Sequence, residues 1–228
     1  MPDCVHAFVQ WLHEWQDFFG GFLGGLVGAV GAIYAVYLTL RKQRKDETNN
    51  VTSAVVTEVT ALAKYVVGAV EVCIEVAKGE RRVPQTDAAY IVRKLFAPPT
   101  VYNAVADRIG LLPHPDATTQ FYMRLEEVKA STSAIEMAVK FQWAPGMSPP
   151  PFISRDIIAP IADMLITALQ LAGPIIADAA KSGPLLQRRI REVTVNQINE
   201  CLVAAKNAFP DAESFTDVPG TRPAGMSF

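Results

Sequence analysis

Residues 18–40 read FFGGFLGGLVGAVGAIYAVYLTL and contain no charged side chain. An α-helix rises about 1.5 Å per residue, so this segment is about 34 Å long and matches a hydrocarbon core of about 30 Å. Aromatic side chains lie near both of its ends, as is typical of a membrane span: Trp11, Trp15, Phe18, Phe19, Tyr34 and Tyr37. The segment therefore predicts a transmembrane helix.

Two other interpretations of this segment are weaker. A cleaved signal peptide begins with basic residues and has a shorter apolar run, whereas residues 1–40 contain no Lys or Arg. In a buried helix of a water-soluble domain, each glycine would cost about 1 kcal/mol relative to alanine. Glycine is more frequent in membrane helices, and this segment contains six: Gly20, Gly21, Gly24, Gly25, Gly28 and Gly31.

The charges on either side of the segment predict its orientation. Residues 1–17 carry acids and no Lys or Arg, whereas Arg41, Lys42, Arg44 and Lys45 follow the apolar run directly. Basic residues are retained on the cytoplasmic side of a span. We therefore expect the N-terminus outside and the rest of the chain in the cytoplasm.

The glycines form two ladders with a spacing of four residues, which places them on one face of a helix. One ladder is Gly20, Gly24, Gly28 and Ala32, and the other is Gly21, Gly25 and Ala29. Such a face lets a second helix backbone approach closely, so we predict association with another copy or with another membrane helix. The alternative is a glycine-rich anchor that has only lipid around it.

Beyond residue 50, apolar residues recur at helical spacing. We expect helices over residues 51–78, 88–95, 100–109, 116–141, 154–181 and 185–209. The inward-facing positions in the first long helix are Val51, Val55, Val59, Leu62, Val66, Ala69, Cys73 and Val76. Those in the next three are Phe121, Leu125, Val128, Thr132, Ile135 and Val139; Ile157, Ile161, Leu165 and Leu169; and Leu186, Ile190, Val193, Cys201 and Ala205.

The predicted fold is all-α, with an N-terminal glycine-rich transmembrane helix followed by an antiparallel four-helix bundle that contains an inserted short helical pair. Thr86–Asp87 is expected to cap the first short helix, and Pro160 and Pro174 to kink or split the third long one. The parts are an outer N-terminus (1–17), the span (18–40), a basic linker or helical continuation (41–50), a cytoplasmic bundle (51–209) and a disordered tail (210–228).

No catalytic, cofactor or metal motif occurs in the chain. Cys4, Cys73 and Cys201 match no zinc or redox spacing, and His6, His13 and His114 have no metal-type partners. The net charge of −2 gives no support to binding of nucleic acid. We therefore expect no catalytic residue, no cofactor and no nucleic-acid partner.

Three charged groups allow two interpretations each. Glu71 with Glu75, and Glu126 with Glu127, are paired acids on helices, which favour a solvated face over a bundle carboxylate site for metals. The cluster Arg188–Arg189–x–Arg191 is either ordinary surface charge or a contact for anionic lipid head groups.

Three short motifs carry a resemblance to known proteins: Pro98-Pro99-Thr100-Val101-Tyr102, Ile109-Gly110-Leu111-Leu112-Pro113 and Phe121-Tyr122-x-x-Leu125. With the preceding apolar segment, residues 16–140 resemble a loose group of uncharacterised bacterial membrane-anchored helical proteins. The resemblance implies a bacterial inner-membrane location and brings no activity with it. Physically, Val101, Val105 and Ile109 are expected to pack on Phe121 and Leu125.

These observations favour a non-enzymatic helical module, anchored in the bilayer, that associates with itself or with a partner. One alternative is a membrane-perturbing effector or channel component, although residues 18–40 offer almost no polar face to line a pore. The other is an enzyme whose site is assembled from scattered residues.

Overall fold

The computed structural model describes residues 2–95, 99–142, 152–181 and 184–215, and the regular structure within these ranges is helical. The all-α prediction is therefore confirmed for the described residues, where strand pairing is limited to an isolated bridge between Pro84 and Phe152. The part of the predicted tail beyond residue 215 lies outside the described residues.

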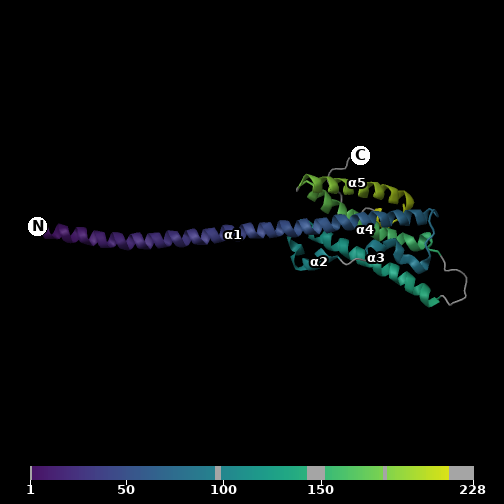
Figure 1. The fold of residues 1–228 in the computed structure, drawn as a ribbon, viewed down its shortest axis with the longest axis horizontal. Helices are drawn as coiled ribbons and strands as arrows, with labels where there is room; N and C mark the ends of the chain where they lie inside the picture. Colours follow the sequence, from purple (N-terminus) through teal and green to yellow (C-terminus); the bar gives the residue numbers. More distant parts are fainter. Residues whose placement is uncertain (1, 96–98, 143–151, 182–183, 216–228) are drawn as a thin grey trace. The chain divides into compact units, whose positions relative to one another are not determined.

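Five α-helices and three 3₁₀ helices follow one another in the described ranges (Figure 1). They are α1 (Pro2–Ala77), η1 (Gln85–Leu95), α2 (Thr100–Ala104), η2 (Ala106–Leu111), α3 (Pro115–Gln142), α4 (Arg155–Ala180), α5 (Leu185–Ala208) and η3 (Glu213–Phe215). The chain divides into two compact units, residues 1–50 and residues 51–228.

The backbone of residues 2–50 is helical throughout and belongs to α1. The basic stretch at 41–50, predicted to be a linker or a continuation of the helix, is therefore helical. α1 ends where Gly79 adopts a positive φ of 75°, a conformation that side chains with a Cβ rarely adopt. The amide of Gly79 donates to the Val76 carbonyl oxygen and that of Glu80 to the Glu75 carbonyl oxygen, which is a Schellman stop.

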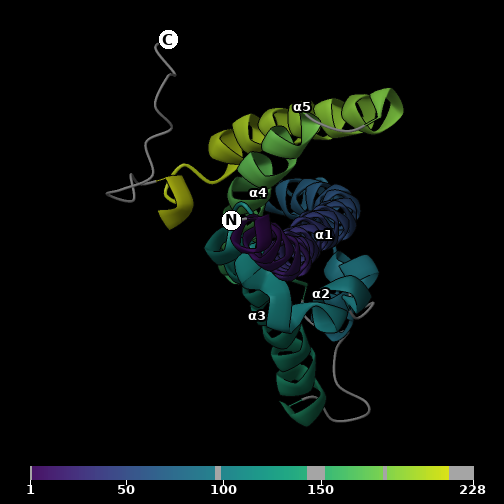
Figure 2. The ribbon, with the colours of Figure 1, turned by 90° about the vertical axis from the view of Figure 1, so that its left-hand side faces the viewer.

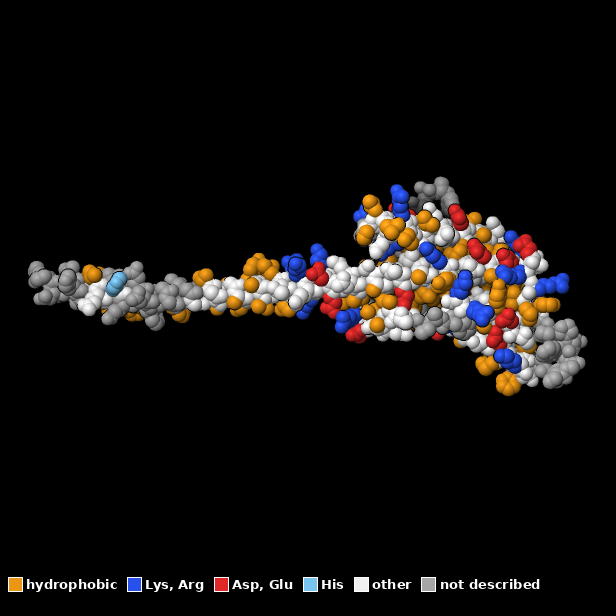
Figure 3. Space-filling model, viewed as in Figure 1, with side chains coloured by type: hydrophobic (Ala, Val, Ile, Leu, Met, Phe, Trp, Pro, Cys, Tyr) orange, Lys and Arg blue, Asp and Glu red, His pale blue; other side chains and the backbone are white. Residues whose placement is uncertain are grey.

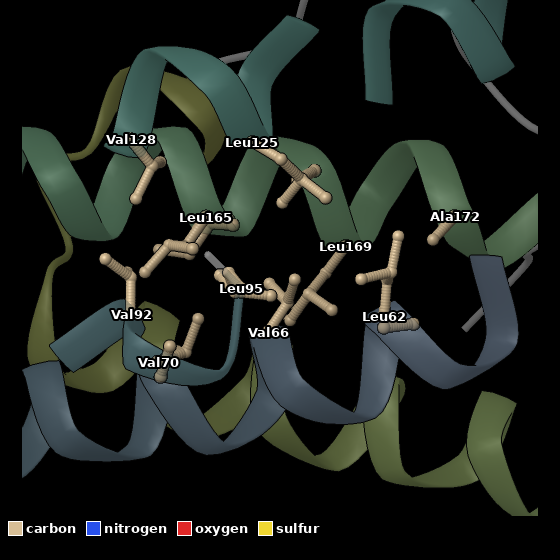
Figure 4. Close-up of a cluster of buried hydrophobic side chains, with 14 of the residues drawn as sticks. Leu62, Val66, Val70, Val92, Leu95, Leu125, Val128, Leu165, Leu169 and Ala172 are labelled. Carbon is tan, nitrogen blue, oxygen red and sulfur yellow. The ribbon is translucent and has the colours of Figure 1, made fainter. Parts of the chain in front are cut away.

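The core of residues 51–228 forms where α1, η1, α3 and α4 meet (Figure 4). Every inward-facing position predicted for the first long helix is buried, from Val51 to Val76. The prediction for α3 also holds, since Phe121, Leu125 and Val128 are buried and Ile135 packs on the core. The close-up labels the side chains that interdigitate: Leu62, Val66, Val70, Val92, Leu95, Leu125, Val128, Leu165, Leu169 and Ala172.

The inserted short helices change the direction of the bundle helices. The Tyr122 hydroxyl in α3 donates a hydrogen bond to Glu58, which lies early in the bundle part of α1. Further along α3, Glu136 accepts a hydrogen bond from the amide of Ala89, which lies in η1 after the end of α1. α1 and α3 therefore run the same way, because the insert returns the chain along the bundle. The expected antiparallel packing holds for α3 with α4 and for α4 with α5, and α4 lies between the other two (Figure 2).

α5 buries a different face from the one we predicted. Leu186, Ile190 and Val193 are exposed, whereas Cys201 and Ala205 are buried as expected. The buried stripe is Arg191, Thr194, Ile198, Cys201 and Ala205. Its two polar side chains are satisfied: Arg191 Nη1 donates to the Ala179 carbonyl oxygen of α4 at 2.7 Å, and Thr194 Oγ1 to the Ile190 carbonyl oxygen of α5 at 2.8 Å.

The C-terminal segment corrects a second prediction. Residues 213–215 form η3 on the surface of α4, although residues from 210 onward were expected to be disordered. The Ser214 amide donates to Asp163 Oδ1 at 2.8 Å, and Gln170 Nε2 donates to the Ser214 carbonyl oxygen at 2.9 Å. Phe215 also packs against the core, so apolar burial and two hydrogen bonds order this short stretch.

Of the helices whose side chains are described, α4 is the one that is long and apolar enough to cross a membrane. This is weak evidence for a span, because the central helix of a water-soluble bundle passes the same test. Ile158, Leu165 and Ile176 are fully buried in the core, which accounts for the apolar composition of α4. Pro160 and Pro174 lie inside α4 and do not split it.

Candidate functional site

The apolar surface of α1 between Gly25 and Leu40 takes no part in the described bundle core. Every side chain in this stretch is exposed, and large ones such as Val27 and Ile33 expose 68% and 70% of their surface. Figure 3 shows hydrophobic side chains along this part of the helix, followed by Lys and Arg. The polar Thr39 hydroxyl donates to the Ala35 carbonyl oxygen at 2.8 Å, so it is satisfied within the helix.

The predicted association face falls partly within the described side chains. A Cβ added at Gly25, Gly28 or Gly31 would meet nothing within 4 Å, and Ala29 and Ala32 are exposed. The side chains at positions 20, 21 and 24 lie outside the description, as do those of Phe18 and Phe19. Arg41, Lys42, Arg44 and Lys45, which were predicted to determine the topology, are exposed on the same helix. The association face remains a prediction.

The clearest polar cluster in the bundle surrounds Glu58, a residue that our sequence analysis missed. Its carboxylate accepts hydrogen bonds from the amides of Val101 and Tyr102 at 2.9 and 3.0 Å and from the Tyr122 hydroxyl at 2.7 Å. The Tyr102 and Tyr122 rings stack with centroids 4.0 Å apart. Burial, and then the hydrogen bond to Glu58, raise the pKa of Tyr122 well above its usual range.

This cluster joins two of the three short motifs that carried the resemblance, through Val101 and Tyr102 of the first and Tyr122 of the third. α2 begins after Pro99, which provides no side-chain cap, so Glu58 satisfies amides that the local sequence leaves free. Val101, Val105 and Ile109 pack against the core that contains Phe121, which agrees with the packing we expected. The sequence offered one sign of this role: Glu58 is an acid directly beside Val59, in a helical segment rich in buried valines.

A groove of about 610 Å³ lies between α1 and α5 within the bundle. Lys64 and Glu71 of α1, with Gln197 and Glu200 of α5, contribute its polar lining. The apolar part includes Val67, Ile74 and Cys201, and the small residues Gly68 and Ala204 keep it open. The apolar line Leu186–Ile190–Val193 of α5, which was predicted to face inward, leads into this groove at Val193.

The thiol in the groove is not an activated nucleophile. Burial, reinforced by the negative charge of Glu71, raises the pKa of Cys201 to about 12, so the neutral thiol persists at physiological pH. Burial also raises the pKa of Cys73 well above its usual range. Cys201 Sγ lies 4.0 Å from the Val67 carbonyl oxygen, to which its S–H donates a weak hydrogen bond. Cys201 therefore acts as a core residue.

The paired acids are separated into different contacts. Glu75 pairs with Arg81 at 2.9 Å, Glu126 with Lys129 at 2.7 Å and Glu127 with Arg124 at 2.6 Å. Glu71 lines the groove instead, so it does not act with Glu75 as one site. Within the described residues, no group of three or more His, Cys, Asp or Glu side chains is arranged to hold a metal ion.

Comparison of the chain with models of protein families, with curated proteins and with solved structures gave no match. The resemblance to bacterial membrane-anchored helical proteins therefore stays a prediction.

Proposed function

We propose that this protein is a single-pass, membrane-anchored helical module of the bacterial inner membrane, without enzymatic activity, that associates with itself or with another membrane helix. In this proposal residues 18–40 cross the bilayer and residues 51–209 form a cytoplasmic bundle. The antiparallel pairs α3–α4 and α4–α5 and the parallel pair α1–α3 make up this bundle.

One observation carries the proposal: the exposed, uncharged helical surface from Gly25 to Leu40. Burying a large aliphatic side chain stabilises a protein by about 1.5–3 kcal/mol. Exposure of the seven large aliphatic side chains here would thus cost on the order of 10 kcal/mol in water. Lipid removes this cost and tolerates glycine in the same helix. The basic cluster that begins at Arg41 supports a cytoplasmic position for everything that follows.

Extraction of native membranes with alkaline carbonate tests the anchor. We expect the wild-type chain to remain in the membrane pellet. Leu26→Arg with Ile33→Arg should release it, because each charge at the centre of a span costs about 2.5–3.5 kcal/mol. Asn50→Arg is the matched control, since it adds a charge outside the predicted span. Release of the wild-type chain by carbonate would contradict the anchor.

The association face is tested by Gly24→Ile with Gly28→Ile. Two bulky side chains at these positions would hold neighbouring backbones apart, while the higher hydrophobicity preserves insertion. We expect the signal of the isolated span in a two-hybrid assay for membrane helices to fall to background. Val27→Ile with Val30→Ile places the same side chains on another face of the helix and should leave the signal unchanged. Equal signals from both double variants would mean that the glycines have no specific role in association.

A further inference from the structure

The first turns of α5 expose apolar and basic side chains together. Leu185 and Leu186 expose 78% and 72% of their surface, and Ile190 exposes 42%. Arg188 and Arg189 lie on the same two turns, where Arg189 is exposed and Arg188 partly so. We call these five residues the leucine–arginine surface. Because α5 packs on α4 through its Arg191–Thr194–Ile198 face, the core does not use this surface.

This surface lies at the end of the bundle where α1 begins its packing. Glu58, in the second turn beyond Val51, binds the start of α2, and the chain then continues through η2 to His114. His114 Nε2 lies 2.7 Å from Asp178 Oδ2 in the last turn of α4, directly before α5. Figure 1 shows the end of α4 and the start of α5 at this same end of the bundle.

The charges around this surface favour an anionic partner. The hydrogen bonds from Lys181 and then from His114 lower the pKa of Asp178, so its carboxylate is ionised and satisfied by these two partners. Arg191 is turned inward to the Ala179 carbonyl oxygen and does not contribute. Arg188 and Arg189 remain beside the exposed leucines, an arrangement typical of protein segments that lie on anionic membranes.

We propose that the leucine–arginine surface docks on the anionic inner leaflet, with Leu185 and Leu186 entering the interface and Arg188 and Arg189 contacting lipid phosphates. The inference rests on the proposed function, which supplies a membrane ten residues away from the bundle along the chain. An arginine near an anionic surface contributes about fivefold to the docked population. The partner is the lipid surface itself, and a second copy of the chain is the competing occupant.

Full-length protein in nanodiscs provides the test, with the environment-sensitive dye NBD attached at Leu186→Cys in a Cys4→Ser background. Cys73 and Cys201 are buried and have raised pKa values, so they react slowly with the dye. Val203→Cys, on the same helix and 64% exposed, is the matched control. The discs contain phosphatidylcholine alone or with about one third phosphatidylglycerol, each with and without a lipid carrying a spin-label quencher.

We expect spin-labelled lipid to quench the dye at position 186, more strongly in anionic discs, and to leave the dye at position 203 unaffected. Arg188→Gln with Arg189→Gln should lower the docked-to-free ratio by about 25-fold, and Arg188→Lys with Arg189→Lys should restore it. Leu185→Cys is a second reporter on the same surface if Leu186→Cys does not fold.

Two results would overturn the docking proposal. One is equal emission at position 186 in detergent, neutral discs and anionic discs, without quenching by lipid. The other is shielding of the dye at position 186 from water that appears only in discs with two chains, which would assign the surface to a second copy of the chain. If the proposed anchor itself is wrong, carbonate releases the wild-type chain from the membrane. If carbonate does not release the chain and the dye is not quenched, only the docking proposal is contradicted.

Discussion

At the scale of single residues, the described hydrogen bonds show one recurring device. Carboxylates on long helices accept hydrogen bonds from backbone amides of the short helices: Glu58 serves α2, Glu136 serves η1, and Asp163 serves η3. The first amides of any helix have no partner within it, so a distant acid completes each of these three short helices. Glu58 is the most connected, because it also accepts the Tyr122 hydroxyl.

Replacement of Glu58 should therefore destabilise the bundle more than a partly exposed acid normally would. Glu58→Ala leaves two amides and one phenol without a partner, and we expect a loss of about 3 kcal/mol in the free energy of unfolding. Tyr122→Phe removes one of the three hydrogen bonds and should cost about 1 kcal/mol. Urea denaturation followed by circular dichroism measures both. Equal, small effects would mean that water replaces the carboxylate at no cost.

The raised pKa of Tyr122 predicts a dependence on alkaline pH. The folded state holds this proton more tightly than the unfolded state does, so the contribution is complete below about pH 10, the ordinary value for a phenol. It is lost as the pH rises further, by at most about 1.4 kcal/mol per pH unit.

Unfolding of wild type and Tyr122→Phe between about pH 8 and pH 11 measures this contribution. The stability advantage of the wild type should shrink above pH 10. An advantage that stays constant over this range would contradict the shift.

At the scale of elements, three glycines of the bundle occupy different backbone environments. Gly68 in α1 and Gly173 in α4 have helical backbone, and an added Cβ would meet nothing within 4 Å. Gly79 has a φ of 75° and ends α1. Glycine lowers helix stability because it gains the most freedom on unfolding, whereas at a left-handed stop it is the residue that fits.

Substitution by alanine should therefore have opposite signs at these positions. Gly68→Ala and Gly173→Ala should each raise the free energy of unfolding by about 0.5–1 kcal/mol. Gly79→Ala should lower it by about 1 kcal/mol, because alanine is strained in the left-handed region. Thermal unfolding of the three variants decides this. A stabilised Gly79→Ala protein would mean that the Schellman stop forms differently in solution.

At the scale of the molecule, the core and the exposed apolar helix belong to separate units. The buried core residues begin at Val51, and none of those described lies in residues 1–50. The described bundle core therefore draws no buried residue from residues 1–50.

A fragment of residues 51–228 should be water-soluble, helical and cooperatively unfolded by heat. A fragment that starts at residue 61 is the control, because it lacks Val51, Val55, Glu58 and Val59 and should lose the fold. Circular dichroism and the binding of a hydrophobic dye separate the two outcomes. A molten 51–228 fragment would show that residues 1–50 support the bundle.

The sequence determined the features that depend on local pattern. The all-α class, the bounds of α3, α4 and α5 and the end of α1 to within a few residues, and the buried stripes of α1 and α3 all follow from apolar residues at a spacing of three and four. The end of α1 at Gly79 could also be predicted, because few residues other than glycine adopt the positive φ that this helix end requires.

The tertiary structure decided whatever depends on a distant partner. α5 turns Arg191 and Thr194 inward and leaves Leu186 and Val193 outside, because the Ala179 carbonyl and α5's own backbone satisfy the polar groups. The parallel course of α1 and α3, the role of Glu58 and the order of η3 have the same origin. A periodic pattern tells which residues are apolar, but only the packed neighbours decide which face of a helix is covered and which orphan amides a distant carboxylate completes.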